Sequence, residues 1–326
     1  MRIKQICWLL ALIAFRGEAQ QLPQYSLFAH NPFAYNPAAA GSEDDLVGSA
    51  LYRRQWVNLE GAPTTYHFNA HLPIYALRSG FGVKVENDLI GAHRTTLGVV
   101  AWNYQIDLGK ATSLSLGLGA GYMGYTLDGA LLRAPDGVYN EPGGPVLHND
   151  PRLPEGLVAV GAPVFEFGVF FRRRSLNIGL AALPVFAPEL REHNNGALRV
   201  QPQRHYALMG IYRLEMSENL SLQPAIFAKT DLIAFQSEIS ASVYWQDNIF
   251  AGISYRGFTP NSRDALVISA GMRLNERARL AYAYDHTLSA LSTAQRGTHE
   301  IMLRYSVSNP AGVGKLPPII YNPRFY

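Results

Sequence analysis

Few residues of this chain have the type and spacing that chemistry requires. The pair His299-Glu300 begins like a zinc-protease motif, but Arg304 stands near the position where a second histidine is needed. His67 and His71 would share one face of a strand, about 13 Å apart along an extended chain. That separation is too long for one metal ion, so the sequence predicts no metal site.

Two further patterns imitate enzyme motifs without the context that such motifs need. The segment Gly119-Ala-Gly-Tyr-Met-Gly124 has the glycine spacing of a dinucleotide-binding loop, which requires a following helix. Its glycines instead lie in an alternating strand pattern, where they leave room on one face. His286 near Ser289 and Ser292 could imitate a hydrolase, although in a loop-like stretch. Because no positioned acid–base pair can be named, we expect no enzyme and no cofactor; an outer-membrane hydrolase is kept as a third alternative.

The composition indicates a β-rich protein. Of 326 residues only 16% are charged, against about 25% in a typical soluble domain, and 11% are aromatic. The aromatic content and the small net charge of +3 exclude a disordered chain and a nucleic-acid partner. A mean hydropathy of −0.03 is too polar for a bundle of transmembrane helices. A large soluble β-sandwich and an outer-membrane barrel remain.

The N-terminus indicates the compartment of the protein, because it predicts export. Arg2 and Lys4 precede an apolar run over 6–15, and small residues precede a cleavage point after Ala19. This three-part pattern predicts a secretory signal peptide over 1–19. Its removal also removes the one cysteine of the chain, so we expect no disulfide and no cysteine-based metal site in the mature protein.

The mature chain is a series of short alternating segments. In residues 113–122, for example, leucine and tyrosine share one face while serine and glycine share the other. Period-two alternation predicts strands, and most of these are long enough to cross a bilayer, which takes about 9–11 tilted residues. Fourteen such segments, an even number as bacterial barrels usually have, are expected. Their spans are 46–58, 64–76, 79–87, 95–107, 113–126, 162–172, 175–186, 204–215, 219–229, 233–246, 248–257, 264–275, 278–287 and 297–308.

The connections between the strands support a membrane barrel. They are mostly tight after even-numbered strands and often long after odd-numbered ones, as in 127–161 and 187–203. Outer-membrane barrels have short periplasmic turns and long extracellular loops. We therefore predict an all-β transmembrane barrel of about 14 antiparallel strands in the outer-membrane lipid, with both termini periplasmic. The chain then divides into a barrel over 46–308, an N-terminal periplasmic segment over 20–45 that could form a plug, and a C-terminal tail over 309–326.

Seven charged residues fall on the polar face of the alternating strands. A lysine or arginine on the lipid face would cost about 2–4 kcal/mol at mid-membrane, so these side chains are expected to face the lumen. They are Lys84, Glu86, Glu166, Glu238, Arg273, Glu300 and Arg304. A solvated lumen wall is the simple interpretation, and an ion or substrate path is the alternative.

The N-terminal segment over 20–45 is rich in turn-forming and aromatic residues. Asn31-Pro32 and Asn36-Pro37 favour turns, and aromatic side chains follow closely on one another: Tyr25, Phe28, Phe33 and Tyr35. A free linker would not carry aromatic residues so densely. We expect the segment to dock inside the barrel or against its periplasmic mouth, which would make the barrel a poor open pore.

A set of short motifs runs in order along nearly all of the mature chain. They are Gln24-Tyr-Ser26, Asn31-Pro32, Asn36-Pro-Ala-Ala-Ala-Gly-Ser42, Leu51-Tyr-Arg-Arg-Gln-Trp56, Gly61-Ala-Pro-Thr64, Asn87-Asp-Leu-Ile-Gly91, Ile253-Ser-Tyr-Arg256, Tyr284-Asp-His-Thr-Leu-Ser289 and Gly297-Thr-His-Glu-Ile-Met-Leu-Arg-Tyr305. With these motifs the chain resembles the PorP/SprF family. The resemblance implies an outer-membrane protein of the type IX secretion system and gliding machinery of Bacteroidota. It also implies a role in secretion or surface attachment of a partner such as a large adhesin, together with other components of that system.

Two surfaces could bind such a partner. The loops 127–161 and 187–203 carry residue types that suit interfaces, namely Tyr139, Arg191 and His193. The N-terminal segment could instead meet the partner, through Tyr25, Phe28, Asn31 and Asn36. The loops could also merely constrict the barrel mouth. A passive porin or hydrophobic-solute channel is the alternative function.

Overall fold

The computed structural model describes residues 22–43, 45–139, 147–150, 153–191, 199–258 and 264–307. This part of the chain consists of strands and six short 3-10 turns. No helix among the described residues is both long and apolar enough to cross a membrane. The expected signal peptide and the C-terminal tail lie outside the described residues.

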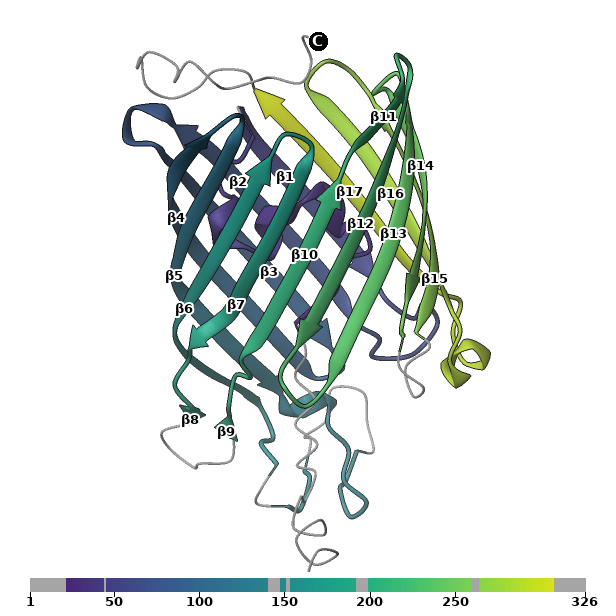
Figure 1. Ribbon diagram of the computed structural model, residues 1–326. Helices are drawn as coiled ribbons and strands as arrows, with labels where there is room; N and C mark the ends of the chain where they lie inside the picture. The colour runs from purple at the N-terminus through teal and green to yellow at the C-terminus, as the bar shows by residue number, and fades with distance from the viewer. Residues whose placement is uncertain are drawn as a thin grey trace, which may run out of the picture.

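The wall strands form one antiparallel sheet that closes on itself (Figure 1). Each strand pairs with its neighbour in the chain, and β1 pairs with β17 to close the barrel, from Leu46 opposite Val307 to Arg54 opposite His299. β10 and β11 both pair with β12 and are two halves of one strand, interrupted at Arg213. The fifteen labelled strands of the sheet therefore form fourteen wall strands, which confirms the predicted count.

The strand bounds agree closely with the sequence pattern. The wall strands are β1 Leu46–Arg54, β2 Thr64–Ile74, β3 Ser79–Ile90, β4 His93–Gly109, β5 Thr112–Asp128, β6 Leu157–Arg173, β7 Leu176–Phe186, β10 His205–Tyr212, β11 Leu214–Ser217, β12 Leu220–Thr230, β13 Phe235–Trp245, β14 Ile249–Arg256, β15 Ala265–Arg273, β16 Ala278–Thr287 and β17 Thr298–Val307. The largest difference is β6, which begins five residues before the predicted 162. A separate two-stranded sheet pairs β8 Leu190–Arg191 with β9 Arg199–Val200.

The outer face of the barrel is apolar. Along β5, Leu116 and Leu118 are exposed by 40% and 56%, whereas Ser115, on the opposite face of the same strand, is only 5% exposed. The same alternation recurs in the burial patterns of β6 and β13. Large apolar side chains without cover suit a lipid solvent, in which a closed barrel also satisfies every backbone hydrogen bond of the wall.

The connections differ at the two ends of the barrel (Figure 1). Those after β4, β6 and β11 have two residues each, and all lie at the end that we call the short-turn end. The connections over 129–156 and 187–204 lie at the opposite, long-loop end. There β4, β5 and β6, of 17 residues each, extend beyond β7. Residues 157–164 of β6 consequently pair with β5 on one edge only among the described residues.

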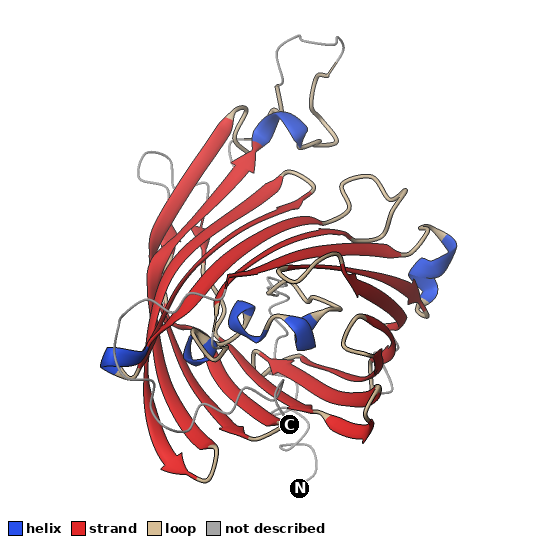
Figure 2. Ribbon diagram, turned by 90° about the horizontal axis from the view of Figure 1, so that it is seen from above, coloured by secondary structure: helices blue, strands red, loops and turns tan. Residues whose placement is uncertain are grey.

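The N-terminal segment over 22–43, which we call the plug, lies inside the barrel (Figure 2). It folds into three 3-10 turns, η1 Phe28–His30, η2 Pro32–Ala34 and η3 Pro37–Ala39. Proline suits the first position of such turns because the nitrogen there needs no partner within the turn. The Asn36 side chain caps η3 by accepting a hydrogen bond from the backbone of Ala38 at 2.9 Å. The Asn-Pro pairs thus start two of the turns.

The plug extends through the lumen from one end to the other. The carbonyl of Leu22 accepts a hydrogen bond from Lys229, which stands one residue before the long-loop end of β12. The carbonyl of Ser42 accepts from Arg172, near the short-turn end of β6. The segment therefore does more than cover one mouth of the barrel, and its first described residue lies in the long-loop half.

Candidate functional site

A buried group of charges lies in the long-loop half of the lumen. Arg53 of β1 donates to Asp285 of β16 and to Glu300 of β17, each at 2.7 Å. These three side chains are at most 3% exposed. Three neighbouring strands at the closing seam of the barrel are thus joined by charge-assisted hydrogen bonds, which are stronger than neutral ones.

A second arginine extends this group across two more strands. Arg256 of β14 donates to Glu238 of β13 at 2.8 Å and to Asp285 at 3.0 Å. Gln24 of the plug adds a hydrogen bond to Glu238 at 3.0 Å. The term ion network is used below for these five charged residues: Arg53, Arg256, Glu238, Asp285 and Glu300.

The plug completes the ion network through one serine. The backbone N–H groups of Ser26 and Leu27 donate to the two carboxylate oxygens of Glu300, at 2.8 and 2.9 Å. The hydroxyl of Ser26 donates to Asp285 at 2.7 Å and accepts from both arginines of the network, at 3.0 and 2.9 Å. Since a buried charge is costly unless it is paired and hydrogen-bonded, the plug is part of what stabilises these groups.

Two more of the inward charges also contact the plug. The Tyr25 hydroxyl donates to Glu86 of β3. Lys84 of β3 pairs with Glu166 of β6 at 2.9 Å and donates to the carbonyl of Ala34 at 3.2 Å. Charges on opposite walls of the barrel therefore meet at the plug, and the simple interpretation as a solvated lumen wall does not describe them.

The two asparagines before the prolines are bound to the wall. The Asn31 side-chain oxygen accepts from Asn69 of β2 at 2.9 Å. The Asn36 side-chain nitrogen donates to the carbonyls of Val169 and Leu180, at 3.0 and 3.2 Å. Each asparagine thus shapes a turn of the plug and also fixes that turn to a strand.

Glycines on the inner face make room for the plug. A Cβ added at Gly80 of β3 would stand 1.9 Å from the carbonyl oxygen of Ala40. One added at Gly117 of β5 would stand 2.3 Å from the backbone nitrogen of Ala38. Real Cβ atoms do not approach so closely, so the plug backbone lies against the wall where side chains are absent. In β5 the glycine that the plug requires is Gly117, whereas Gly119 and Gly121 lie against residues of the neighbouring wall strands.

Arg304 and Arg273 lie nearer the short-turn end. Arg304 donates to the carbonyl of His30 at 2.7 Å and also binds Glu43. Arg273 is half-buried, and its Nε has no hydrogen-bond partner among the described residues. Both arginines line a small cavity of about 40 Å³ together with His30. Of the seven charges expected in the lumen, six belong to the ion network or bind the plug, Glu166 only through its pair with Lys84, and Arg273 is the seventh.

The plug residues offered as a partner surface are occupied within the barrel. Tyr25, Phe28, Asn31 and Asn36 are all at most 4% exposed. The Phe28 ring packs on Phe227 of β12, with ring centroids 5.3 Å apart. Each of these four side chains is buried in this conformation, so a partner could meet them only after displacement of the plug.

The loop residues offered as the other partner surface are described in part. The Tyr139 hydroxyl accepts from the backbone of Ala134 at 2.7 Å and lies 2.9 Å from His148 Nδ1, while Arg133 stacks over its ring at 4.6 Å. Tyr139 thus stabilises its own loop. Arg191 belongs to β8 at the long-loop end, and His193 lies outside the described residues.

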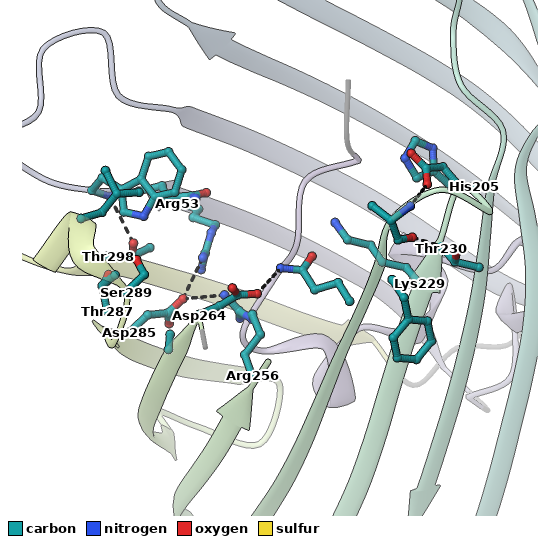
Figure 3. Close-up of a pocket in the computed structure, with 18 of the residues that line it drawn as sticks. Arg53, His205, Lys229, Thr230, Arg256, Asp264, Asp285, Thr287, Ser289 and Thr298 are labelled. Carbon is teal, nitrogen blue, oxygen red and sulfur yellow. Dashed lines mark hydrogen bonds and ion pairs between the residues drawn. The ribbon is translucent and has the colours of Figure 1, made fainter. Parts of the chain in front are cut away.

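A cavity of about 660 Å³ lies on the long-loop side of the ion network (Figure 3). Arg53, Arg256 and Asp285 line it on one side and Lys229 and His205 on the other. The remaining lining includes hydroxyl, amide and apolar side chains: Gln55, Trp56, Thr230, Ile233, Phe235, Gln236, Thr287, Ser289, Leu291 and Thr298. Within the part of the chain that the structure describes, no group of three His, Cys, Asp or Glu residues could hold a metal ion.

Asp231, one of the acidic residues that line this cavity, belongs to a turn. The Asp231 carboxylate accepts hydrogen bonds from the backbone of Ile233 at 2.9 Å and of Ala234 at 2.6 Å. Partial burial would raise the pKa of Asp231, but the backbone hydrogen bonds of Ala234 and Ile233 outweigh it and lower the pKa. The carboxylate is thus a charged turn cap.

The sequence reasoning selected only part of the ion network. Arg53 and Arg256 were quoted within motifs but not assigned to the lumen, and Ser26 was not singled out. The sequence nevertheless contained a sign of this site. Five of its residues each lie in a different one of the motifs that carry the family resemblance: Ser26, Arg53, Arg256, Asp285 and Glu300. What the spacing could not show was that these segments meet.

The fold and this site define a class of protein. The chain is an outer-membrane β-barrel of fourteen strands whose lumen is occupied by its own N-terminal segment. Its sequence from residue 17 to residue 305 matches the family described as type IX secretion system membrane protein PorP/SprF. The chain belongs to that family, as its motifs predicted.

Solved structures with a similar fold are distant in sequence. A FadL homologue of Pseudomonas aeruginosa is 12% identical, with 87% of this chain and 94% of that chain covered and a TM-score of 0.46. The CymD monoaromatic hydrocarbon channel is 10% identical, with coverages of 86% and 93% and a TM-score of 0.49. The Ralstonia pickettii toluene transporter TbuX is 9% identical, with coverages of 84% and 92% and a TM-score of 0.49. No curated protein sequence matches the chain.

Proposed function

We propose that this protein is a plugged barrel that supports secretion or surface attachment of a partner protein, such as a large adhesin, and performs no chemistry of its own. The observation that carries the proposal is the plug. It is held by buried charges and hydrogen bonds along the lumen, so the barrel is built to remain occupied. Membership of a type IX secretion family makes a secreted protein the natural partner.

The way in which the plug is held argues against a passive porin. An open pore needs a solvated path, whereas here Glu238 and Glu300 are 0% exposed and Lys84 and Glu166 are at most 4% exposed. Their charges face each other and the plug. The lumen charges therefore serve to retain the plug, and the porin is kept only as the alternative that the experiments below can favour.

The partner would bind at the long-loop end. Residues 157–164 of β6 have a free strand edge among the described residues, and such edges accept extended segments of other proteins. Tyr139 lies in the connection that precedes β6, and Arg191 and His193 lie in the connection that follows β7. We place this end outside the cell and the short-turn end, where the wall begins at Leu46 and ends at Val307, in the periplasm, because bacterial barrels direct their short turns to the periplasm.

Deletion of the gene in its own host tests this function. Loss of one or a few proteins from the cell surface, together with reduced spreading or adhesion, is the expected result. The complemented strain is the control. Unchanged surface proteins combined with reduced uptake of small solutes would overturn the proposal in favour of the channel.

Copurification gives the second test. Tagged protein isolated from its native cells should carry a secreted partner. Hydrogen–deuterium exchange should then show slower exchange in residues 157–164 of the complex than of the barrel alone. Equal exchange at this edge in both samples would place the partner elsewhere.

A further inference from the structure

The cavity on the long-loop side contains a buried cation for which the described residues provide no acidic partner. Lys229 of β12 is 5% exposed and lines the cavity, and its ammonium group donates to the carbonyl of Leu22. No carboxylate lies within 4.0 Å of this nitrogen among the described residues. An ammonium group has three protons to donate, so two remain for another acceptor.

The acidic residues around the cavity are already engaged. Asp285 pairs with both arginines of the ion network. Asp231 caps its own turn, and Asp264 accepts from the Gln236 side chain at 3.0 Å. Burial of an unpaired charge is costly, and an anion bound beside Lys229 would reduce that cost.

A second buried polar group faces the same cavity. His205 of β10 is 5% exposed and lines the cavity beside Lys229 (Figure 3). Its Nδ1 lies 3.0 Å from the carbonyl of Gln203, which fixes Nδ1 as the donor. Its Nε2 has no hydrogen-bond partner among the described residues. Because Nδ1 carries the proton, Nε2 is an acceptor, and since buried polar atoms are nearly always paired it indicates a hydrogen-bond donor supplied from outside, such as an N–H group of a bound peptide.

The rest of the lining sets the size and the polarity of that group. A cavity of about 660 Å³ falls in the range of about 300–1,000 Å³ that small-molecule sites occupy. Three of its apolar lining side chains are exposed, namely Ile233, Phe235 and Leu291, and Trp56 is half-buried, whereas most of its buried lining side chains are polar, among them Arg53, Lys229 and Asp285. This arrangement suits an anionic head with an apolar body.

We infer that this cavity binds a carboxylate whose carbon body lies against the apolar lining side chains and whose oxygens contact Lys229. The carboxylate could belong to a free organic acid or to the end of a peptide chain. The peptide case rests on the proposed function, because it would be the point at which a secreted partner enters the barrel mouth. The chemistry is the same in both cases.

The test uses the full-length mature protein in detergent and two matched pairs of probes. 3-Phenylpropionate is compared with 3-phenylpropanamide, and acetyl-Gly-Phe with a free carboxylate is compared with acetyl-Gly-Phe-amide. Isothermal titration calorimetry measures the dissociation constants. At least one acid should bind tenfold or more tightly than its amide, because only the acid offers Lys229 a negative charge.

Variants assign the effect to this lysine. Lys229→Met should weaken binding of the acid at least tenfold, and Lys229→Arg, which keeps the charge, should restore most of it. Lys110→Met is the matched control, because Lys110 is exposed in the turn between β4 and β5 at the opposite end. Equal affinity for acids and amides in the unmodified protein, or an unchanged affinity in Lys229→Met, would overturn the inference.

The two probe pairs separate the sources of the carboxylate. Binding of the peptide acid supports a protein terminus as the occupant, and binding of 3-phenylpropionate alone supports a free organic acid. If Lys229→Met loses the probes but cells carrying it retain all surface proteins, the peptide case is wrong while the proposed function stands. If gene deletion leaves the surface proteins unchanged although the probes bind, the proposed function fails and the carboxylate site remains.

Discussion

At the scale of single residues, the lumen is stabilised by charges that could not be buried alone. Glu300 is 0% exposed and accepts hydrogen bonds from Arg53 and from the backbone of Ser26 and Leu27. Removing one partner of a buried ion pair costs more than the pair contributes, because the other charge remains without compensation. These residues therefore have a large effect on stability for their number.

Glu300→Gln is predicted to destabilise the barrel by about 3–5 kcal/mol, the cost of leaving a buried charge uncompensated. Arg53 would then keep Asp285 as its carboxylate partner, together with its hydrogen bond to the Ser26 hydroxyl. The free energy of unfolding, measured by urea titration of protein in lipid vesicles, checks this value. Faster proteolysis within 22–43 should accompany the loss.

Glu215→Gln is the control for that experiment. Glu215 pairs with Arg213 at 3.6 Å, but its side chain is 69% exposed. Exposed pairs contribute about 0–1 kcal/mol. An equal loss of stability in both variants would mean that the ion network has no special role.

Part of this site was predictable from strand parity. Lys84, Glu166, Glu238 and Glu300 were expected inside from alternation alone, and the structure buries each of them. Their partners were not predictable, because the bonded residues stand far apart in the chain: Ser26 and Glu300 are 274 positions apart. Parity gives the face of a residue and says nothing of which other strand it reaches.

At the scale of elements, the plug and the glycines of β3 and β5 fit each other. Gly80 and Gly117 lie opposite the backbone of η3 and its neighbours, where a Cβ would collide with main-chain atoms. Main chain cannot turn aside as a flexible side chain does. The inner face of these strands is therefore complementary in shape to the backbone of the plug.

Gly80→Ala is predicted to displace the plug and raise the ion conductance of the protein in planar bilayers. The new Cβ would stand 1.9 Å from the Ala40 carbonyl oxygen. Overpacking of this kind typically costs about 1–3 kcal/mol. Deletion of residues 22–43 should raise the conductance further, whereas the unmodified protein should conduct poorly.

Gly98→Ala serves as the matched control in the same measurement. An added Cβ at this position of β4 meets nothing within 4 Å. The variant should therefore conduct as little as the unmodified protein. Large, stable conductance of the unmodified protein would contradict the prediction for the whole series.

The strands themselves were the most predictable elements. Alternation placed every wall strand, because each has lipid on one face and the lumen on the other. The start of β6 at Leu157 was missed because residues 157–160 are Leu-Val-Ala-Val, so the residue types do not alternate there although the burial of the side chains does. The turns at the two Asn-Pro pairs of the plug were predictable, but their positions in the lumen were not, because they depend on wall strands that follow the plug in the chain.

At the scale of the whole molecule, the exposed apolar side chains define where the lipid lies. Trp102 and Trp245 are exposed by 45% and 50% on the outer wall, at β4 and β13. Trp56 instead lines the cavity at the long-loop end. The three tryptophans of the mature chain thus report on two different environments.

Brominated phospholipids are predicted to quench the fluorescence of Trp102 and Trp245 but not that of Trp56. Variants that keep one tryptophan each, with phenylalanine at the other two positions, allow separate measurements. A water-soluble quencher should reduce the fluorescence of Trp56 more strongly than that of Trp102 or Trp245. Strong quenching of Trp56 by brominated lipid would contradict the placement of the long-loop end outside the bilayer.

The plug contacts both sides of the closing seam, and this fixes the order in which the molecule can be assembled. The ion network joins Arg53 on the first wall strand to Glu300 on the last, with Ser26 between them. Contacts between chain ends carry the largest loop-closure entropy and form late. We therefore expect closure of the seam between β1 and β17 to be also the step that locks the plug, so that a barrel with an unlocked plug is a barrel whose folding is not finished.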